Sequence, residues 1–336
     1  MDLLHSWGVN LAVHLQTEYR AYENWFQLVS SVADLHTTFF IFFPIWFHLK
    51  RDVSIKLIWV AVVGDWFNLV LKWVLFGERP YWWVHETKFY GIDPAPALRQ
   101  VPITCETGPG ALIWGSVNLW FLRLVTLINL TCTTEETLAL LFSGTVLMRA
   151  MLKLMIFNVL LTRACVMSGI IVAEVFSRQK WIYRASLQKY FSITVFLLVF
   201  AVGFYVLLKV LGVDLLWTLE KAQKWCNNPS WVNMDTSPFA SLLRNMGTLF
   251  GLGLGLHWPL CSESKLSSSA AFRISCIGVS LVLLQLLDSL SFSSDNQATF
   301  YLLSFSKSAA ALLVPTTLVP GGISLFLLGK KDEKTS

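Results

Sequence analysis

Asp65, Lys72 and Arg79 follow one another at intervals of seven residues in an otherwise apolar stretch. On an α-helix this spacing keeps the three side chains on one face, with a drift of about 20° per step. A charge within a membrane span is costly unless it is paired, solvated or near the edge. The stripe therefore indicates a water-filled cavity, unless Lys72 snorkels to the interface and Arg79 lies beyond the helix end in water.

The composition shows which elements must position these charges. Hydrophobic residues make up 55% of the chain and charged residues 14%, whereas about 25% of the residues of soluble domains are charged. Several runs approach the roughly 20 apolar residues that span a bilayer core, and their lack of period-2 alternation favours helices over a barrel. We expect an all-α polytopic membrane protein, a bundle of about eight to nine transmembrane helices forming a single integral membrane domain over 1–336. The predicted spans are 27–48, 56–76, 111–130, 137–161, 164–176, 191–211, 240–257, 272–290 and 300–322.

Lysine and arginine predict the orientation, because short cytoplasmic loops are enriched in them. They collect in 50–56, in 178–189 and in the tail after Gly329, which should face the cytoplasm. The Trp-rich loops 77–110 and 212–238 should lie on the opposite side, with their aromatic rings at the membrane interface. The lipid bilayer is thus an expected partner, and no basic patch supports binding to nucleic acid.

The sequence around Lys72 and Arg79 resembles a known family. A lysine, six residues and Arg-Pro resemble the first signature of the membrane-bound acid phosphatase superfamily. The longer words are similar to the glucose-6-phosphatase catalytic subunit family over roughly 1–110 and 168–320. These words are IWVAVVGDWFNLVLKWVLFGERPYWWV (58–84), CETGPG (105–110), the stretch 185–226 and DTSPFASLLRNMGTLFGLGLGL (235–256).

This resemblance implies a nine-span, multi-pass protein of the endoplasmic reticulum membrane that hydrolyses glucose 6-phosphate at its lumenal face. In the family mechanism one histidine attacks phosphorus and a second protonates the leaving oxygen, roles that suit imidazole near neutral pH. Lys72 and Arg79 carry over as substrate-binding residues, since guanidinium matches phosphate oxygens bidentately and lysine adds a point charge. The resemblance implies no cofactor and no metal. It implies a sugar phosphate as ligand and a glucose 6-phosphate transporter as a further partner.

Both histidine signatures of the family are missing. After CETGPG the chain continues with ALIWGS, and no histidine lies between His85 and His257. No catalytic residue is therefore identifiable from the family pattern. His85 is the one histidine near the lumenal end of the Lys72 and Arg79 stripe, and an interfacial role beside its aromatic neighbours is the competing interpretation.

The interior 111–167 does not match the family words. From a lumenal residue 110 to a cytoplasmic loop at Arg178 the chain must cross the membrane an odd number of times. A third crossing over 164–176 would be about 20 Å long, short of the roughly 30 Å core. A splice variant, a mispredicted exon, a shifted reading frame or an evolved non-catalytic member would each explain this interior. We therefore expect a glucose-6-phosphatase relative with impaired or no hydrolysis, or a non-catalytic membrane protein with a phosphate-binding remnant.

Two further patterns bear on packing. Cys105 and Cys226 both fall in predicted lumenal loops, where an oxidising compartment permits pairing, although unpaired structural cysteines are an equal alternative. The six cysteines show no metal-binding spacing. The small residues of LFGLGLGL (249–256) lie at helical spacing and predict close helix packing rather than ligand binding.

Overall fold

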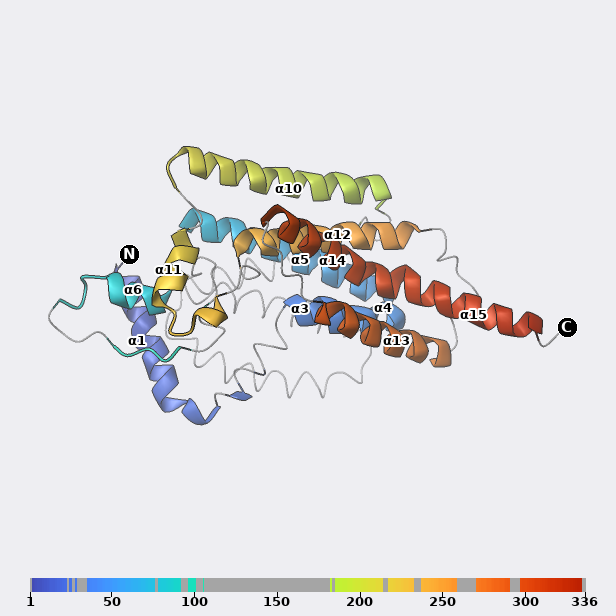
Figure 1. Ribbon diagram of the computed structural model, residues 1–336, viewed down its shortest axis with the longest axis horizontal. Helices are drawn as coiled ribbons and strands as arrows, with labels where there is room; N and C mark the ends of the chain where they lie inside the picture. The colour runs from blue at the N-terminus through green and yellow to red at the C-terminus, as the bar shows by residue number, and fades with distance from the viewer. Residues whose placement is uncertain are drawn as a thin grey trace.

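A computed structural model describes residues 2–22, 24, 25, 28, 35–75, 78–91, 96–100, 105, 182, 185–213, 217–232, 237–258, 270–290 and 297–333. Within these ranges all regular structure is helical (Figure 1). The α-helices are α1 (Asp2–Glu18), α3 (Leu35–Thr37), α4 (Phe43–Leu49), α5 (Arg51–Leu75), α6 (Pro80–Glu86), α10 (Leu187–Val210), α11 (Trp217–Trp225), α12 (Pro238–His257), α13 (Ala270–Ser289), α14 (Gln297–Leu313) and α15 (Val319–Glu333). Short 3-10 turns occur at Arg20–Tyr22 and Pro229–Trp231.

Three of the predicted spans appear as long apolar helices. Leu187–Val210, Ala270–Ser289 and Thr299–Phe326 are each long and apolar enough to cross a membrane. They match the predictions 191–211, 272–290 and 300–322. The predicted spans 56–76 and 240–257 coincide with α5 and α12, which are also helical along their length. The predictions 111–130, 137–161 and 164–176 lie outside the described residues.

Two of the apolar helices contain a π-helical turn followed or interrupted by proline. Thr38–Phe42 joins α3 to α4, with Pro44 as the second residue after it, and Val314–Leu318 joins α14 to α15 around Pro315. Proline lacks an N–H and leaves the ladder of helical hydrogen bonds incomplete, so a widened turn is an expected response. The Thr316 hydroxyl donates a hydrogen bond to the Leu312 carbonyl at 2.6 Å. In both cases the three segments follow one another without a break, so each forms one continuous helix.

Helices α5 and α10 run parallel to each other. The Trp59 indole donates to the Tyr190 hydroxyl at 3.1 Å, and the Trp66 indole donates to the Leu197 carbonyl at 3.1 Å. Both contacts join residues that are 131 positions apart, so the two helices advance in the same direction. If α5 leads from one face of the membrane to the other, the chain between α5 and α10 must recross it an odd number of times.

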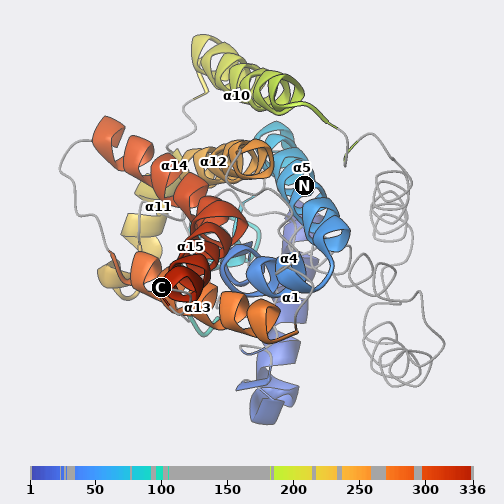
Figure 2. The ribbon, with the colours of Figure 1, turned by 90° about the vertical axis from the view of Figure 1, so that its right-hand side faces the viewer.

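Helix α12 lies at the centre of the described bundle and runs against α5 and α10. Its lower-numbered residue Asn245 reaches Asp65 of α5, whereas Phe250 lies against Phe191 at the start of α10 (Figures 1 and 2). Figure 2 shows α10 on the outside of the bundle, where much of its Phe and Val surface is exposed. An exposed apolar surface of this kind suits contact with lipid.

The packing of α12 on α14 is close because glycines line the contact. An added Cβ at Gly247 would meet the backbone of Phe305, and one at Gly251 would meet the backbone of Ala309. On another face of α12, a Cβ at Gly253 would lie 2.7 Å from the Cβ of Tyr190. The prediction of close helix packing over 249–256 is confirmed.

The basic segments and the Trp-rich segments lie at opposite ends of the bundle. Arg51 begins α5 directly after Lys50, and Lys189 lies in the first turn of the parallel helix α10, so all three lie at one end of the bundle. The described parts of 77–110 and 212–238 gather at the other end, with α1 beside them (Figure 1).

Candidate functional site

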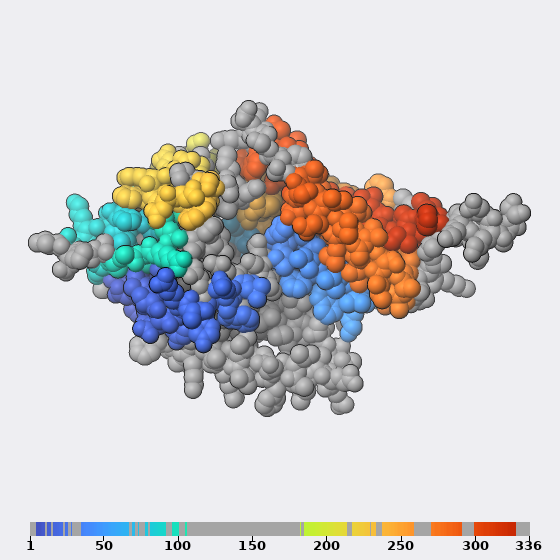
Figure 3. Space-filling view, turned by 60° about the horizontal axis from the view of Figure 1, so that its bottom comes forward, coloured from blue at the N-terminus to red at the C-terminus, as the bar shows by residue number. Residues whose placement is uncertain are grey.

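The end of the bundle opposite the basic residues carries a cap, which we define as α1, α6, α11 and the described residues between 87 and 105. Figure 3 shows these three helices gathered at one end of the molecule. Their shared core is rich in aromatic residues, and we expected those rings to lie at the membrane interface. The structure corrects this for Tyr81, Trp82 and Trp83, which are only 4%, 0% and 3% exposed. Two helices covering α6 from different sides leave little room for its rings to reach an interface.

Arg79 lies at the boundary between α5 and α6. Helix α5 ends at Leu75, and Arg79 has an extended backbone (φ −85°, ψ 144°) immediately before Pro80, the first residue of α6. Its carbonyl accepts a hydrogen bond from the Trp83 amide at 3.0 Å, which starts the new helix. The stripe predicted on a single helix therefore stops before Arg79. The reason is that proline fixes the backbone needed for a new helix and biases the preceding residue away from the helical region.

The other two charges of the stripe have different surroundings. Lys72 lies in α5, one turn before its end, and its side chain is outside the described part of the structure. Asp65 is 7% exposed and accepts hydrogen bonds from Asn245 at 2.6 Å and Ser241 at 3.3 Å. Asp65 therefore joins α5 to α12 inside the bundle. The structure assigns it to helix packing, while Arg79 is half-buried at the cap.

An ion-pair network attaches α6 and the residue before Arg79 to α11. Lys221 reaches Glu78 at 3.1 Å and Glu86 at 2.7 Å, and Lys224 lies 3.9 Å from Glu86. The Trp225 indole adds a hydrogen bond to Glu86 at 2.8 Å. Two carboxylates and two ammonium groups balance formally, so this network fixes the boundary around Arg79 without adding net charge.

The pKa values of this network move in the direction that strengthens it. Partial burial alone would raise the pKa of Glu86, but hydrogen bonds from Lys221 and Trp225 outweigh it, so the pKa lies below its ordinary value of 4.5. Burial alone would lower the pKa of Lys221, but its bonds to Glu86 and Glu78 raise it above 10.5. Both groups are therefore charged throughout the neutral range.

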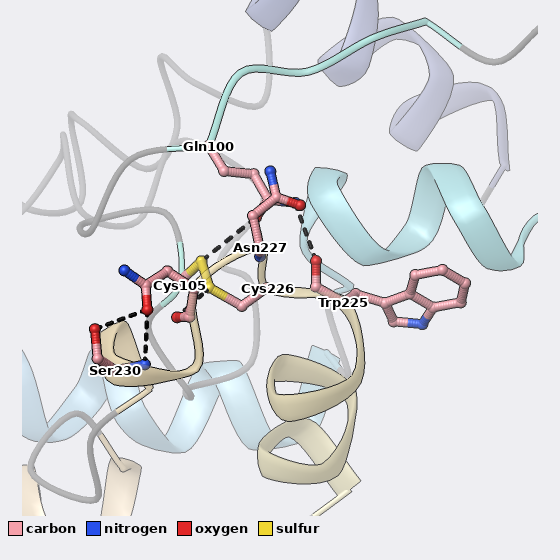
Figure 4. Close-up of a disulfide and its surroundings, with 7 residues drawn as sticks. Gln100, Cys105, Trp225, Cys226, Asn227 and Ser230 are labelled. Carbon is pink, nitrogen blue, oxygen red and sulfur yellow. Dashed lines mark hydrogen bonds between the residues drawn. A yellow bond between two sulfur atoms is a disulfide. The ribbon is translucent and has the colours of Figure 1, made fainter.

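A disulfide connects the second half of the cap. Cys105 and Cys226, which are 121 positions apart in sequence, are bonded (Figure 4). Of the two alternatives for these cysteines, pairing is the one that the structure shows. Gln100 supports the crosslink: its amide donates to the Trp225 carbonyl at 3.0 Å, and its oxygen accepts from the Asn227 amide at 2.8 Å. The residues before the CETGPG word are thereby held against the end of α11.

His85 lies on α6 in contact with α11. Its ring stacks on Trp225 with centroids 4.7 Å apart and planes 10° apart, and the residue is exposed. Flat stacking on an indole at the protein surface fits the interfacial interpretation of this histidine. Among the described residues no group of three His, Cys, Asp or Glu side chains could hold a metal ion.

Sequence reasoning missed the partners of Glu78 and Glu86. Lys221 and Glu78 are 143 residues apart, so no local spacing relates them. The one available signal was the position of both segments in loops predicted on the same side of the membrane. Two segments on the same side of the membrane can touch, but this does not predict which lysine pairs with which glutamate.

The helices and the cap together define the general class of this protein. The chain is a multi-pass helical membrane protein with a disulfide-linked cap, and the cation Arg79 lies where α5 meets the first helix of that cap, α6. Comparison with known proteins then gives the family. The chain is 58% identical to glucose-6-phosphatase catalytic subunit 1 of Haplochromis nubilus, over 99% of each chain. It is 47% identical to the catalytic subunit 1 of Felis catus, over 100% of this chain and 99% of the relative.

A relative named differently aligns as completely. The chain is 39% identical to glucose-6-phosphatase 2 of Mus musculus over the whole of both chains. This chain belongs to the glucose-6-phosphatase catalytic subunit family. No family model and no solved structure matches it. The alignments extend over 350 to 355 residues, more than the 336 of this chain, so the relatives contain residues that it lacks.

Proposed function

We propose that this chain binds the phosphate group of a sugar phosphate, glucose 6-phosphate in the family context, at the cap of the bundle. Lys72 and Arg79 are the proposed ligands. The observation that carries the proposal is the position of Arg79, at the joint between the helix that bears Lys72 and the buried helix α6. A guanidinium there can bind two phosphate oxygens at once, and an ammonium group near the helix end adds a second positive charge.

The rigidity of the joint supports this assignment. The Lys221 network holds Glu78, the residue before Arg79. Pro80 follows Arg79 directly, and the Trp83 amide donates a hydrogen bond to the Arg79 carbonyl. A ligand fixed in this way loses less conformational freedom when an anion binds. The full-length relatives named as glucose-6-phosphatases support glucose 6-phosphate as the ligand.

We propose further that hydrolysis by these 336 residues is weak or absent. The sequence lacks the Ser-Pro-Ser-Gly-His run and the later arginine-to-histidine signature, and no histidine occurs between His85 and His257. Binding without a nucleophile cannot break the phosphate ester. The endoplasmic reticulum membrane is the proposed location, with the cap on the lumenal side, where a disulfide is stable.

Two measurements on the purified chain test the proposal. Phosphate release from glucose 6-phosphate measures hydrolysis, and calorimetric titration with inorganic phosphate measures binding. We expect binding that weakens at least tenfold in Arg79→Ala and in Lys72→Ala, the loss expected for a charged hydrogen bond. Lys88→Ala is the matched control, because Lys88 is an exposed cation in the same cap. Equal binding by Arg79→Ala and Lys88→Ala would refute the assignment.

The hydrolysis measurement distinguishes an active phosphatase from a protein that binds phosphate without hydrolysing the ester. We expect phosphate release at the background rate. Release that is well above background and is lost in His85→Ala would show that His85 has replaced the missing nucleophile. Release that survives His85→Ala would place a catalytic group elsewhere in the chain, and either result would contradict the proposal of a non-hydrolysing protein.

A further inference from the structure

Trp82 carries a buried donor for which no described residue supplies an acceptor. Its side chain is 0% exposed, and its indole N–H has no hydrogen-bond partner among the described residues. Buried polar groups nearly always have a partner, so an orphan of this kind calls for an explanation. An indole nitrogen is a donor only, so the missing partner must be an acceptor.

The position of Trp82 restricts where that acceptor can be. Arg79 directly precedes α6 and Trp82 is the third residue of the helix, so their side chains are attached to the backbone within one helical turn of each other. The neighbouring ring, Trp83, packs in the other direction, against His5 of α1 and against Tyr90. Trp82 instead lies edge to face with Trp217 of α11, with centroids 6.0 Å apart.

The Trp82 ring is held firmly in that orientation. It contacts Tyr81 edge to face at 5.0 Å as well as Trp217, and α6 is fixed to α11 through Lys221 and Trp225. A second buried donor in the cap, the Tyr90 hydroxyl, also lacks a partner. Tyr90 lies in the turn after α6 on the Trp83 side, and a hydroxyl can rotate toward any acceptor. The indole cannot rotate in this way, so it points in one fixed direction.

From these contacts we infer that the Trp82 indole N–H donates a hydrogen bond to an oxygen of the phosphate group bound by Arg79. This inference rests on the proposed function and adds a third, uncharged ligand to it. A phosphate group offers several oxygens that are strong hydrogen-bond acceptors, which matches a donor-only group. The indole would add a directional hydrogen bond to a site whose other ligands attract the anion by charge. Anions too small to reach the indole N–H would then bind less tightly than phosphate.

Trp82→Phe tests the inference, because it keeps an aromatic ring in the core and removes the N–H. We expect binding of inorganic phosphate and of glucose 6-phosphate to weaken about tenfold each, which corresponds to about 1.4 kcal/mol. Trp83→Phe is the matched control, with the same substitution on the other side of α6, and it should leave both affinities unchanged. Thermal unfolding of the unliganded Trp82→Phe protein should occur at or above the wild-type temperature, because an unpaired buried donor has been removed.

Three results would overturn the inference while leaving the proposed function intact. Unchanged affinities in Trp82→Phe, with Arg79→Ala still weakened, would show that the N–H is satisfied by water. Weakened binding of glucose 6-phosphate alone would move the contact from the phosphate to the sugar. Equal weakening by Trp83→Phe would show a general effect of cap packing. If the wild-type chain binds no phosphate, the proposed function itself fails.

A second measurement applies if Trp82→Phe does not fold. In the wild-type chain labelled with ¹⁵N-tryptophan, one indole signal should move downfield when inorganic phosphate is added, as expected for a new hydrogen bond to an anion. Arg79→Ala should abolish the shift. Saturating phosphate that moves no indole signal would overturn the inference without any change at Trp82.

Discussion

Gly251→Ala should destabilise the bundle although alanine favours helices. A methyl group at Gly251 would lie 2.8 Å from the Cα and 2.9 Å from the carbonyl carbon of Ala309. These are backbone atoms of α14, so the contact can be relieved only by moving one helix from the other. Extra methyl groups in a well-packed core cost about 1–3 kcal/mol, and replacing glycine by alanine in a helix returns up to about 1 kcal/mol.

Gly278→Ala is the matched control, because an added Cβ there meets nothing within 4 Å. It should gain the helix-propensity term and carry no packing cost. The two variants should therefore differ by the packing term alone, about 1–3 kcal/mol. At about 2–4 °C per kcal/mol, Gly251→Ala should unfold several degrees below Gly278→Ala in detergent. Equal unfolding temperatures, or a higher one for Gly251→Ala, would refute the close contact between α12 and α14.

Three further predictions concern the cap and the buried polar contacts. Cys226→Ser should lower the unfolding temperature, and in denatured, unreduced protein it should expose one additional thiol to a maleimide reagent; an unchanged thiol count would contradict the disulfide. The lowered pKa of Glu86 means that its ion pairs stabilise the cap above pH 4.5 and are lost as the pH falls through the lower folded-state pKa. Acid unfolding followed by tryptophan fluorescence should therefore begin at higher pH in the protein with Lys221→Met, in which Glu86 loses the strongest of the contacts that lower its pKa. Asn245→Ala should cost about 1–3 kcal/mol by leaving buried Asp65 without its shortest hydrogen bond, and an unfolding temperature equal to wild type would show that Asp65 is solvated.

The transmembrane part of the fold was largely predictable from the sequence. Apolar runs bounded by charges predicted α10 and α13 to within a few residues, and clusters such as Lys50 and Arg51 predicted which end of the bundle they share. These features depend on transfer between water and hydrocarbon, which acts on each segment independently. The glycines of α12 were equally informative, since a missing side chain allows close approach wherever a neighbouring helix arrives.

The cap was much less predictable, because its contacts join segments that are far apart in sequence. Nothing in the spacing of Cys105 and Cys226 distinguished a disulfide from two free thiols, and nothing related Lys221 to Glu86. Arg79 is different, because the signal was present. Proline at position 80 disfavours a helical Arg79 and favours a helix start after it. The seven-residue periodicity concealed this, since Asp65, Lys72 and Arg79 follow one another at equal intervals of seven residues.

The disulfide also affects how the chain folds during translation, because its two cysteines are synthesised at different times. Cys105 and Cys226 are separated by 121 residues, which take about 6–24 s to synthesise at about 5–20 residues per second. For that interval the nascent chain carries α6 without α11, with Cys105 unbonded and with Cys132 and Cys165 following it as competing thiols. A premature link between Cys105 and either of these thiols would have to be exchanged before Cys105 could pair with Cys226.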